Sequence, residues 1–218
     1  DPNTANKFVV TWNEPNTQRG KAIVGTVSGT TISYGSEAEF YSSEATDTFV
    51  AFDPSTAGRF VVACRVQSSY YGKAAVGTVT GTSISFGALV QYSATNSPYP
   101  SIAFDPNTAG KFMMVYKSVA AQRGKAKVGT ISGTSISFGT EYEFNTGSAS
   151  EHIEAAFDPN NANKFVVVYT DGGNSSYGTA VVASVSGTAI SFGSEYVYNS
   201  ATTEYSRISF DPNASGKF

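Results

Sequence analysis

The dipeptide Asp-Pro recurs at nearly constant spacing along this 218-residue chain and divides it into similar segments. It begins at Asp1, Asp53, Asp105, Asp158 and Asp211, at intervals of 52, 52, 53 and 53 residues. A period of this size is typical of stacked or ring-shaped arrays of small units that cannot bury their apolar surface alone. We therefore expect one repeat domain over 1–218, with units at 1–52, 53–104, 105–157 and 158–210, and with 211–218 beginning a further copy.

Each unit contains four short segments rich in β-branched and aromatic residues, and each segment is predicted to be a strand. One set of four consecutive strands is expected near 49–52, 60–64, 73–79 and 83–92, so that the first strand precedes the Asp-Pro turn. The first strand has copies at 101–104, 154–157 and 207–210. The first two strands are apolar at consecutive positions, as in a sheet covered on both faces, whereas the fourth alternates. The first two are therefore expected inside and the fourth at the rim.

Four-stranded antiparallel units of about this length, buried inside and wet outside, predict a β-propeller. The sequence thus predicts an all-β fold with four blades, one for each repeat. The ring can close by pairing 206–210 with the strand at 8–12, or the chain can be part of a larger ring. Both chain ends fall at the same point of a repeat, which favours a piece of a longer array. Mid-strand glycines at 35, 87, 139 and 193 predict a bulge or bend.

Composition excludes several classes of function. Charged residues make up 14% of the chain and the formal net charge is −3, which argues against a nucleic-acid partner. The single cysteine, Cys64, allows neither an intrachain disulfide nor a paired-cysteine zinc site. No apolar run approaches the length of a membrane span, so no membrane insertion is expected. No cofactor and no metal site are predicted.

The loops of the units differ on one face only. The Asp-Pro turns and the Gly-Thr turns between the third and fourth strands are nearly constant. The other connections differ from copy to copy, and we call them the variable loops: 13–19, 65–71, 117–123, 170–177, 41–47, 93–99, 145–152 and 199–205. Packing constrains the sequence of every unit in the same way, so sequence divergence confined to the loops of one face suggests a functional surface on a rigid scaffold. Drift in unconstrained loops is the alternative interpretation.

Aromatic and polar side chains on the face that carries the variable loops are the candidate ligand-binding residues. They are Tyr70, Tyr71, Tyr99, Tyr177, Tyr205, Asn96, Asp47, Asp171 and Arg207, with Glu151 beside them. Flat rings stack on the C–H faces of sugars, while amides and carboxylates bind hydroxyl groups. Tyrosine is also a common contact residue in protein interfaces, so a protein receptor is the alternative partner.

Other conspicuous residues are interpreted as structural. The Asp-Pro-Asn turn offers one carboxylate, where calcium takes six to eight oxygens, so an Asx-type turn with Gly or Asn in the left-handed position is expected. Equivalent positions at the end of the second strand form a column that is core or the floor of a pocket: Trp12, Cys64, Tyr116 and Tyr169. The lone histidine, His152, is expected to be a loop residue rather than a catalytic base.

The segment Ser132-Gly-Thr-Ser-Ile-Ser-Phe-Gly139 resembles the tandem repeats of uncharacterised marine bacterial and phage surface or tail-fibre-like proteins. The resemblance covers all four units. It implies an exterior repeat protein, located extracellularly, at a cell surface or on a virion.

Together these features predict a non-enzymatic recognition or adhesion module that binds a cell-surface glycan or a protein receptor through the variable loops. The alternative is a structural or assembly subunit of a virion, fibre or extracellular layer, with self-association or a larger assembly as its partner. An enzyme is not expected, because no acid–base or nucleophile set recurs among the copies.

Overall fold

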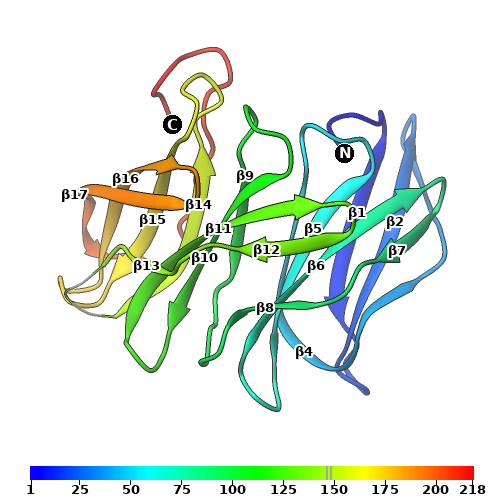
Figure 1. The fold of residues 1–218 in the computed structure, drawn as a ribbon, viewed down its shortest axis with the longest axis horizontal. Coiled ribbons are helices and arrows are strands. Elements are labelled where there is room, and N and C mark those ends of the chain that lie inside the picture. The colour runs from blue at the N-terminus through cyan, green and yellow to red at the C-terminus, as the bar shows by residue number, and fades with distance from the viewer. Residues whose placement is uncertain (146, 148) are drawn as a thin grey trace.

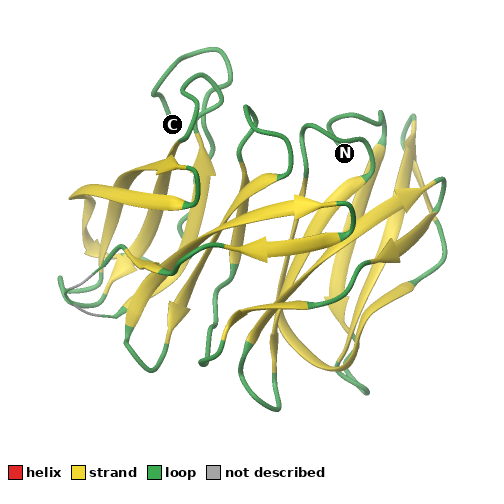
Figure 2. Cartoon of the chain, viewed as in Figure 1, coloured by secondary structure: helices red, strands yellow, loops and turns green. Residues whose placement is uncertain are grey.

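The computed structural model of the protein describes residues 1–145, 147 and 149–218. Thr146 and Ser148, which belong to the variable loop 145–152, lie outside the described residues. Every regular element of the described part is a β-strand (Figure 2). The all-β prediction is therefore confirmed. Nothing in that part forms a helix of the length and hydropathy needed to cross a membrane.

The strands follow the repeats in order. The first repeat forms β1 (Lys7–Asn13), β2 (Arg19–Ser28), β3 (Thr31–Tyr34) and β4 (Ala38–Phe52). The second forms β5 (Arg59–Val66), β6 (Gly72–Thr80), β7 (Ser83–Phe86), β8 (Val90–Ser93) and β9 (Ser101–Phe104). The third forms β10 (Lys111–Ser118), β11 (Arg123–Ser132), β12 (Ser135–Phe138), β13 (Tyr142–Glu143) and β14 (Ser150–Phe157). The fourth forms β15 (Lys164–Asp171), β16 (Tyr177–Ser186) and β17 (Ala189–Thr202).

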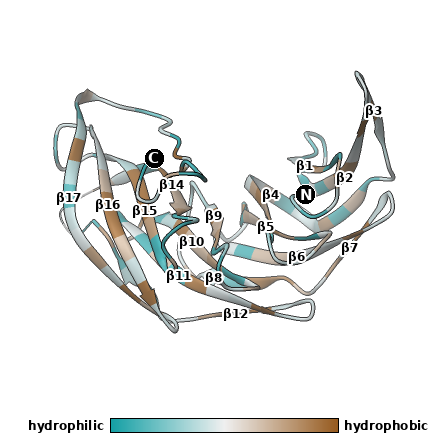
Figure 3. Ribbon diagram, turned by 90° about the horizontal axis from the view of Figure 1, so that it is seen from above, coloured by the Kyte–Doolittle hydropathy of each residue, from teal (hydrophilic) through white to brown (hydrophobic). Residues whose placement is uncertain are grey.

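The strands form antiparallel sheets that follow one another around an open arc (Figures 1 and 3). The strand β4 is long enough to take part in two sheets: its first part pairs with β2 and its last part pairs with β5. The other two sheets have the orders β12-β11-β10-β9 and β14-β15-β16-β17. The strands β1, β4, β9 and β14 lie toward the concave side of the arc, and β3, β7, β12 and β17 lie at its rim (Figure 3). The predicted order from inside to rim is therefore confirmed. In the following we call the sheets units one to four, where unit one is β1, β2, β3 and the start of β4.

The two ends of the arc differ from the sequence-based expectation. The predicted strand at 207–210 is not a strand, although Ile208 and Phe210 pack against Val166 and Val168 of β15. Within the described residues, β1 is hydrogen-bonded to β2 and to no other strand. The pairing of 206–210 with the strand at 8–12 is therefore not made. A strand needs a neighbour for its backbone N–H and C=O groups, and the 206–210 segment lies at the opposite end of the arc from β1 (Figure 3).

The core lies between consecutive units. Alternate residues of β10 face opposite neighbours: Met113 packs with Phe165 of unit four, whereas Met114 packs with Val61 of unit two. Because a strand directs successive side chains to opposite sides, a strand covered on both faces is apolar at every position. This explains the uninterrupted apolar runs of the second strand in each repeat.

The Asp-Pro turns connect each unit to the next. Each aspartate accepts a hydrogen bond from the backbone N–H two residues later, as in Asp53 and Ser55 (2.8 Å), so the predicted Asx-type turn is confirmed. The left-handed position carries asparagine or glycine, as expected: Asn6, Gly58, Gly110, Asn163 and Gly216. The turns also bind across units. The side chain of Asn3 donates to the Pro54 carbonyl oxygen (2.9 Å), and the Gly58 N–H donates to Asp1 Oδ2 (2.8 Å).

The predicted bulge is confirmed at the mid-strand glycines. The strands on either side of Gly35, Gly87 and Gly139 pair with the same neighbouring strand in registers that differ by one residue. These three glycines also lie close to the next unit. A Cβ atom added at Gly87 would lie 2.0 Å from the Thr134 carbonyl oxygen of the next unit, and one at Gly35 would lie 1.8 Å from that of Thr82. A Cβ atom at Gly139 would lie 2.7 Å from Thr188. These glycines are therefore required by the close approach of neighbouring units. Gly193 likewise lies at a register shift, in the β16–β17 ladder, but a Cβ atom added there would lie 3.4 Å from its nearest neighbour, the Val182 carbonyl oxygen.

Candidate functional site

Four equivalent residues, one from each repeat, have an unusual backbone conformation. They are Asp47, Tyr99, His152 and Tyr205, with φ angles of 48°, 57°, 49° and 54°. Residues other than glycine rarely adopt positive φ, and such residues are concentrated at functional sites. The first and third lie where the β4–β5 and β14–β15 ladders shift register, between Thr46 and Phe49 and between Glu151 and Glu154. The same local distortion therefore recurs where each unit begins its innermost segment.

These four residues line one small cavity. Its volume is about 200 Å³, and all four repeats contribute to its wall: Asp47, Thr48, Phe49, Tyr99, Pro100, His152, Ile153, Glu154, Tyr205 and Arg207. The His152 ring lies between two tyrosine rings, with centroid distances of 5.0 Å to Tyr99 and 4.1 Å to Tyr205. The cavity thus combines an aromatic wall with charged side chains. We call it the axial cavity, because every repeat supplies it from the inner end of its sheet.

Two carboxyl groups of the axial cavity have different surroundings. Burial raises the pKa of Glu154, and this effect exceeds the opposing influence of the Arg207 guanidinium and of the Ile208 backbone N–H. Arg207 Nε lies 3.0 Å from Glu154 Oε2. The Asp47 carboxylate instead forms an ion pair with Arg65, whose Nε lies 2.9 Å from Asp47 Oδ2. Two carboxyl groups placed in unlike environments are the usual basis for separate acid and base roles.

Arg65, at the end of β5, joins several of the predicted residues and was missed by the sequence analysis. Besides Asp47, it donates from Nη1 to Asn96 Oδ1 (3.2 Å), and its guanidinium carbon lies 5.7 Å from the centre of the Tyr70 ring. At the equivalent position of the next repeat, Lys117 Nζ lies 2.8 Å from Glu151 Oε1. A cation repeated at this position, with an acidic residue in a variable loop of the neighbouring repeat, was the signal that could have found it.

The structure brings together only part of the predicted site. Asp47, Tyr99, Tyr205 and Arg207 line the axial cavity, and Tyr70 and Asn96 reach it through Arg65. The remaining three residues lie elsewhere. Tyr71 is exposed beside β6, and Tyr177 begins β16.

Asp171 is a structural residue. It is buried at the end of β15 and accepts hydrogen bonds from Asn145 Nδ2 and from the Gly173 N–H, both at 3.0 Å. It therefore stabilises the turn between β15 and β16. Its side chain is not among those that line the axial cavity.

The residues interpreted as structural are mostly confirmed. Cys64, Tyr116 and Tyr169 are buried in the core, whereas Trp12 is partly exposed at the end of the arc. Burial raises the pKa of the Cys64 thiol to about 12. The predicted loop position of His152 was wrong. The residue is buried in β14, because this strand begins earlier than predicted.

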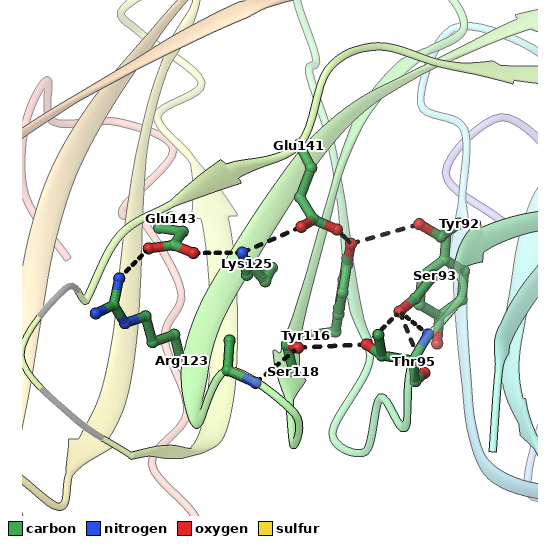
Figure 4. Close-up of polar contacts among 10 residues, drawn as sticks. Tyr92, Ser93, Thr95, Tyr116, Ser118, Arg123, Lys125, Glu141 and Glu143 are labelled. Atoms are coloured by element: carbon green, nitrogen blue, oxygen red, sulfur yellow. Dashed lines mark hydrogen bonds and ion pairs between the residues drawn. The ribbon is translucent and has the colours of Figure 1, made fainter.

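A second polar cluster lies in unit three, on its side toward unit two (Figure 4). The Tyr116 hydroxyl donates to Glu141, and Lys125 Nζ contacts both Glu141 (3.1 Å) and Glu143. Arg123 donates to Glu143 from the other side. These groups bind one another, and burial and the Glu141 contact raise the pKa of Tyr116. We interpret the cluster as a structural network that fixes β13 on β11.

The comparisons with known proteins concern the fold. No protein-family model matches the sequence, and no curated protein matches it. One similar solved structure is AofleA from Arthrobotrys oligospora, with a TM-score of 0.59 and 8% identity; the match covers 90% of this chain and 55% of that one. Another is an exo-β-1,3-galactanase from Phanerochaete chrysosporium with galactose, with a TM-score of 0.55 and 10% identity; the match covers 89% of this chain and 48% of that one. An exo-β-1,3-galactanase from Clostridium thermocellum is also similar (TM-score 0.52, 10% identity, 92% and 49%).

The chain spans about half the length of these structures. The fold is therefore all-β and propeller-like. The resemblance to marine bacterial and phage repeats, and the exterior location that it implies, stay predictions.

The comparisons correct the functional expectation. A non-enzymatic recognition or adhesion module, with a structural subunit as its alternative, was predicted because no acid–base set recurs among the copies. Two of the structures named above are exo-β-1,3-galactanases, so proteins with a similar fold include enzymes. The lack of a recurring acid–base set does not exclude an enzyme, because a cavity lined by all repeats takes a different residue from each. At the equivalent positions of the axial cavity these residues are aspartate, tyrosine, histidine and tyrosine. Recurrence is therefore not the signature of such a site.

Proposed function

We propose that the axial cavity hydrolyses a glycosidic bond at the end of a glycan chain. The observation that carries this proposal is the pair of unlike carboxyl groups: Glu154, whose pKa is raised by burial, and Asp47, which is held as an ion pair by Arg65. The similarity to the two galactanases supports it at the level of the fold. We also infer that the four units are four blades of a propeller.

The two carboxyl groups have complementary roles in this proposal. Glu154, protonated more readily than an ordinary glutamate, donates its proton to the glycosidic oxygen as the bond to the anomeric carbon breaks. Asp47 accepts a proton from a water molecule, whose oxygen forms the new bond to that carbon. Arg207 is the positioning residue for Glu154, since it binds the carboxyl oxygen at 3.0 Å.

The aromatic wall and the size of the cavity define the substrate class. The Tyr205 and Tyr99 rings offer faces on which a pyranose ring stacks. A volume of about 200 Å³ is smaller than the roughly 300–1,000 Å³ of pockets for drug-sized ligands. The cavity therefore suits one terminal sugar unit rather than an internal stretch of chain.

The test is release of a terminal sugar by the full chain. Purified protein is incubated with a panel of 4-nitrophenyl glycosides and with β-1,3-linked galacto-oligosaccharides, and products are separated by anion-exchange chromatography. We expect Glu154→Gln to lower the rate by about 10²–10⁴-fold, the range for loss of a general acid. Tyr71→Phe, outside the cavity, is the matched control and keeps full activity. Circular dichroism confirms that each variant is folded. The proposal is overturned if no substrate is cleaved, or if Glu154→Gln is as active as the unmodified chain.

A further inference from the structure

The two ends of the arc expose residues whose equivalents are buried inside it. On the side of unit one that faces away from unit two, Val10 is 41% exposed and Ile32 is 53% exposed. The equivalents of Val10 in the later units are Val62, Met114 and Val167, and all are buried. We call this surface the N-terminal end face. It is defined by Val10, Ile32 and Tyr34.

The far side of unit four shows the same contrast. Val182 is 44% exposed and Tyr198 is 50% exposed. The equivalents of Val182 are Val24, Val76 and Val128, and those of Tyr198 are Phe40, Tyr92 and Phe144; all six are buried between units. We call this surface the C-terminal end face, defined by Val182, Tyr196 and Tyr198. An apolar cavity lies over it, lined partly by Tyr196, Tyr198 and Ile208.

The internal interfaces show what covers these faces. Each pairs an aromatic ring from the rim of one unit with a ring of the next: Phe40 with Phe86 (5.8 Å), Tyr92 with Phe138 (6.2 Å) and Phe144 with Phe192 (5.8 Å). The series would continue with Tyr198 opposite Tyr34. Likewise Gly35, Gly87 and Gly139 each meet the Gly-Thr turn of the next unit, whereas Gly193 meets no such turn. The equivalent partner of Gly193 is Thr30, at the N-terminal end face.

We propose that the chain associates head to tail with a second copy of itself, the C-terminal end face of one copy packing on the N-terminal end face of the next. Three internal interfaces of the same chain already form this contact, so the proposed interface continues an established one. The two faces differ, so the interface is heterologous and is able to close a ring or continue as a fibre. Large exposed apolar surfaces are typical of such interaction sites.

The chain ends fit this arrangement. Among the described strands β1 pairs with β2 alone, so no strand occupies the inner side of β1 in unit one. The 206–210 segment lies against unit four and has no strand partner. In the second copy, β1 would pair with this segment, as β5 pairs with the end of β4. Residues 211–218 are similar in sequence to residues 1–8 and occupy the corresponding place. They are largely exposed, and residues 1–8 of the second copy displace them.

The test is the mass of the chain in solution. Light scattering after size-exclusion chromatography, or sedimentation equilibrium, is expected to show association that rises with protein concentration. Val10→Asp and Val182→Asp each spoil one end face at an exposed side chain, and Tyr71→Asp is the control at an exposed site outside both faces. Either end-face variant alone is expected to be monomeric, while the control associates as the unmodified chain does.

Mixing the two variants separates this proposal from other modes of association. Val10→Asp keeps its C-terminal end face and Val182→Asp keeps its N-terminal end face. An equimolar mixture is therefore expected to form a dimer that neither variant forms alone. A monomeric unmodified chain at every concentration overturns the proposal, and so does a mixture that stays monomeric. Circular dichroism and urea unfolding of each variant exclude loss of the fold as the cause.

Discussion

The close approach of neighbouring units at Gly87 and its absence at Gly193 give a matched pair of substitutions. A Cβ atom at Gly87 would lie 2.0 Å from the carbonyl oxygen of Thr134 in the next unit, whereas one at Gly193 would lie no closer than 3.4 Å to any atom. Gly87→Ala should therefore force two units apart. Gly193→Ala should be accepted without rearrangement. Both glycines occupy the same position of the repeat, and both follow the tripeptide Ile-Ser-Phe.

The expected magnitudes differ in sign. Overpacking a well-packed core costs about 1–3 kcal/mol of stability. The atom contacted at Gly87 is a backbone oxygen, which cannot rotate away, so we expect Gly87→Ala to lower the free energy of unfolding by about 3 kcal/mol. Gly193→Ala removes only the flexibility of glycine in the unfolded chain, which stabilises by up to about 0.5–1 kcal/mol. For a chain of this size about 1 kcal/mol shifts the melting temperature by about 2–4 °C. Gly87→Ala should thus lower it by about 6–12 °C, and Gly193→Ala should leave it unchanged or slightly raised.

The melting temperatures are measured by thermal unfolding followed by circular dichroism. Urea unfolding followed by tyrosine fluorescence gives the midpoint and the slope m of each variant. Protein is kept dilute, so that self-association through the C-terminal end face does not contribute. A lower midpoint at unchanged m for Gly87→Ala reports lost stability. Equal midpoints for the two variants would refute the argument, since the contact between units would then have no energetic consequence.

Three further predictions concern buried polar groups. Tyr116→Phe removes a hydrogen bond to the Glu141 carboxylate and should lower the free energy of unfolding by about 1.5–3 kcal/mol, which urea unfolding measures. The Cys64 thiol, with its pKa raised to about 12, should react with iodoacetamide only after unfolding in urea, as mass spectrometry would show; rapid labelling of the folded chain contradicts this. The raised pKa of Glu154 favours the folded state below the ordinary glutamate pKa of 4.5, and this contribution is lost as the pH rises through the folded pKa. Between pH 4 and pH 7 the unmodified chain should therefore lose stability relative to Glu154→Gln, and a constant difference between their urea midpoints would count against it.

The fold could be predicted from the sequence to a large extent, because packing between units imposes the same pattern on every copy. The Asp-Pro period located the units, and the apolar runs at 60–64 and 112–116 identified the strands covered on both faces. What a single strand does at the end of the arc was not predictable. The 207–210 segment has the sequence of an inner strand, yet it lacks the neighbour that would supply its hydrogen bonds.

The candidate site was predictable only in part, because it depends on backbone geometry. Asp47, Tyr99 and Tyr205 were selected from the variable loops for their side chains, but their convergence follows from a shared positive φ that no residue type among them signals. Glu154 was read as part of an apolar inner strand, since two alanines and a phenylalanine follow it. Its place beside the cavity comes from the register shift of β14, which brings Glu154 opposite Val168.

The positive-φ positions of the axial cavity have a consequence for how such a chain can diversify. Each repeat places one side chain in the wall of the axial cavity from a position of positive φ, at 47, 99, 152 and 205. A substitution at one of these positions changes that part of the wall together with its contacts, as at His152, whose ring lies beside those of Tyr99 and Tyr205. Duplication of the repeat supplies the scaffold, and point substitutions at these four positions change the chemistry of the cavity.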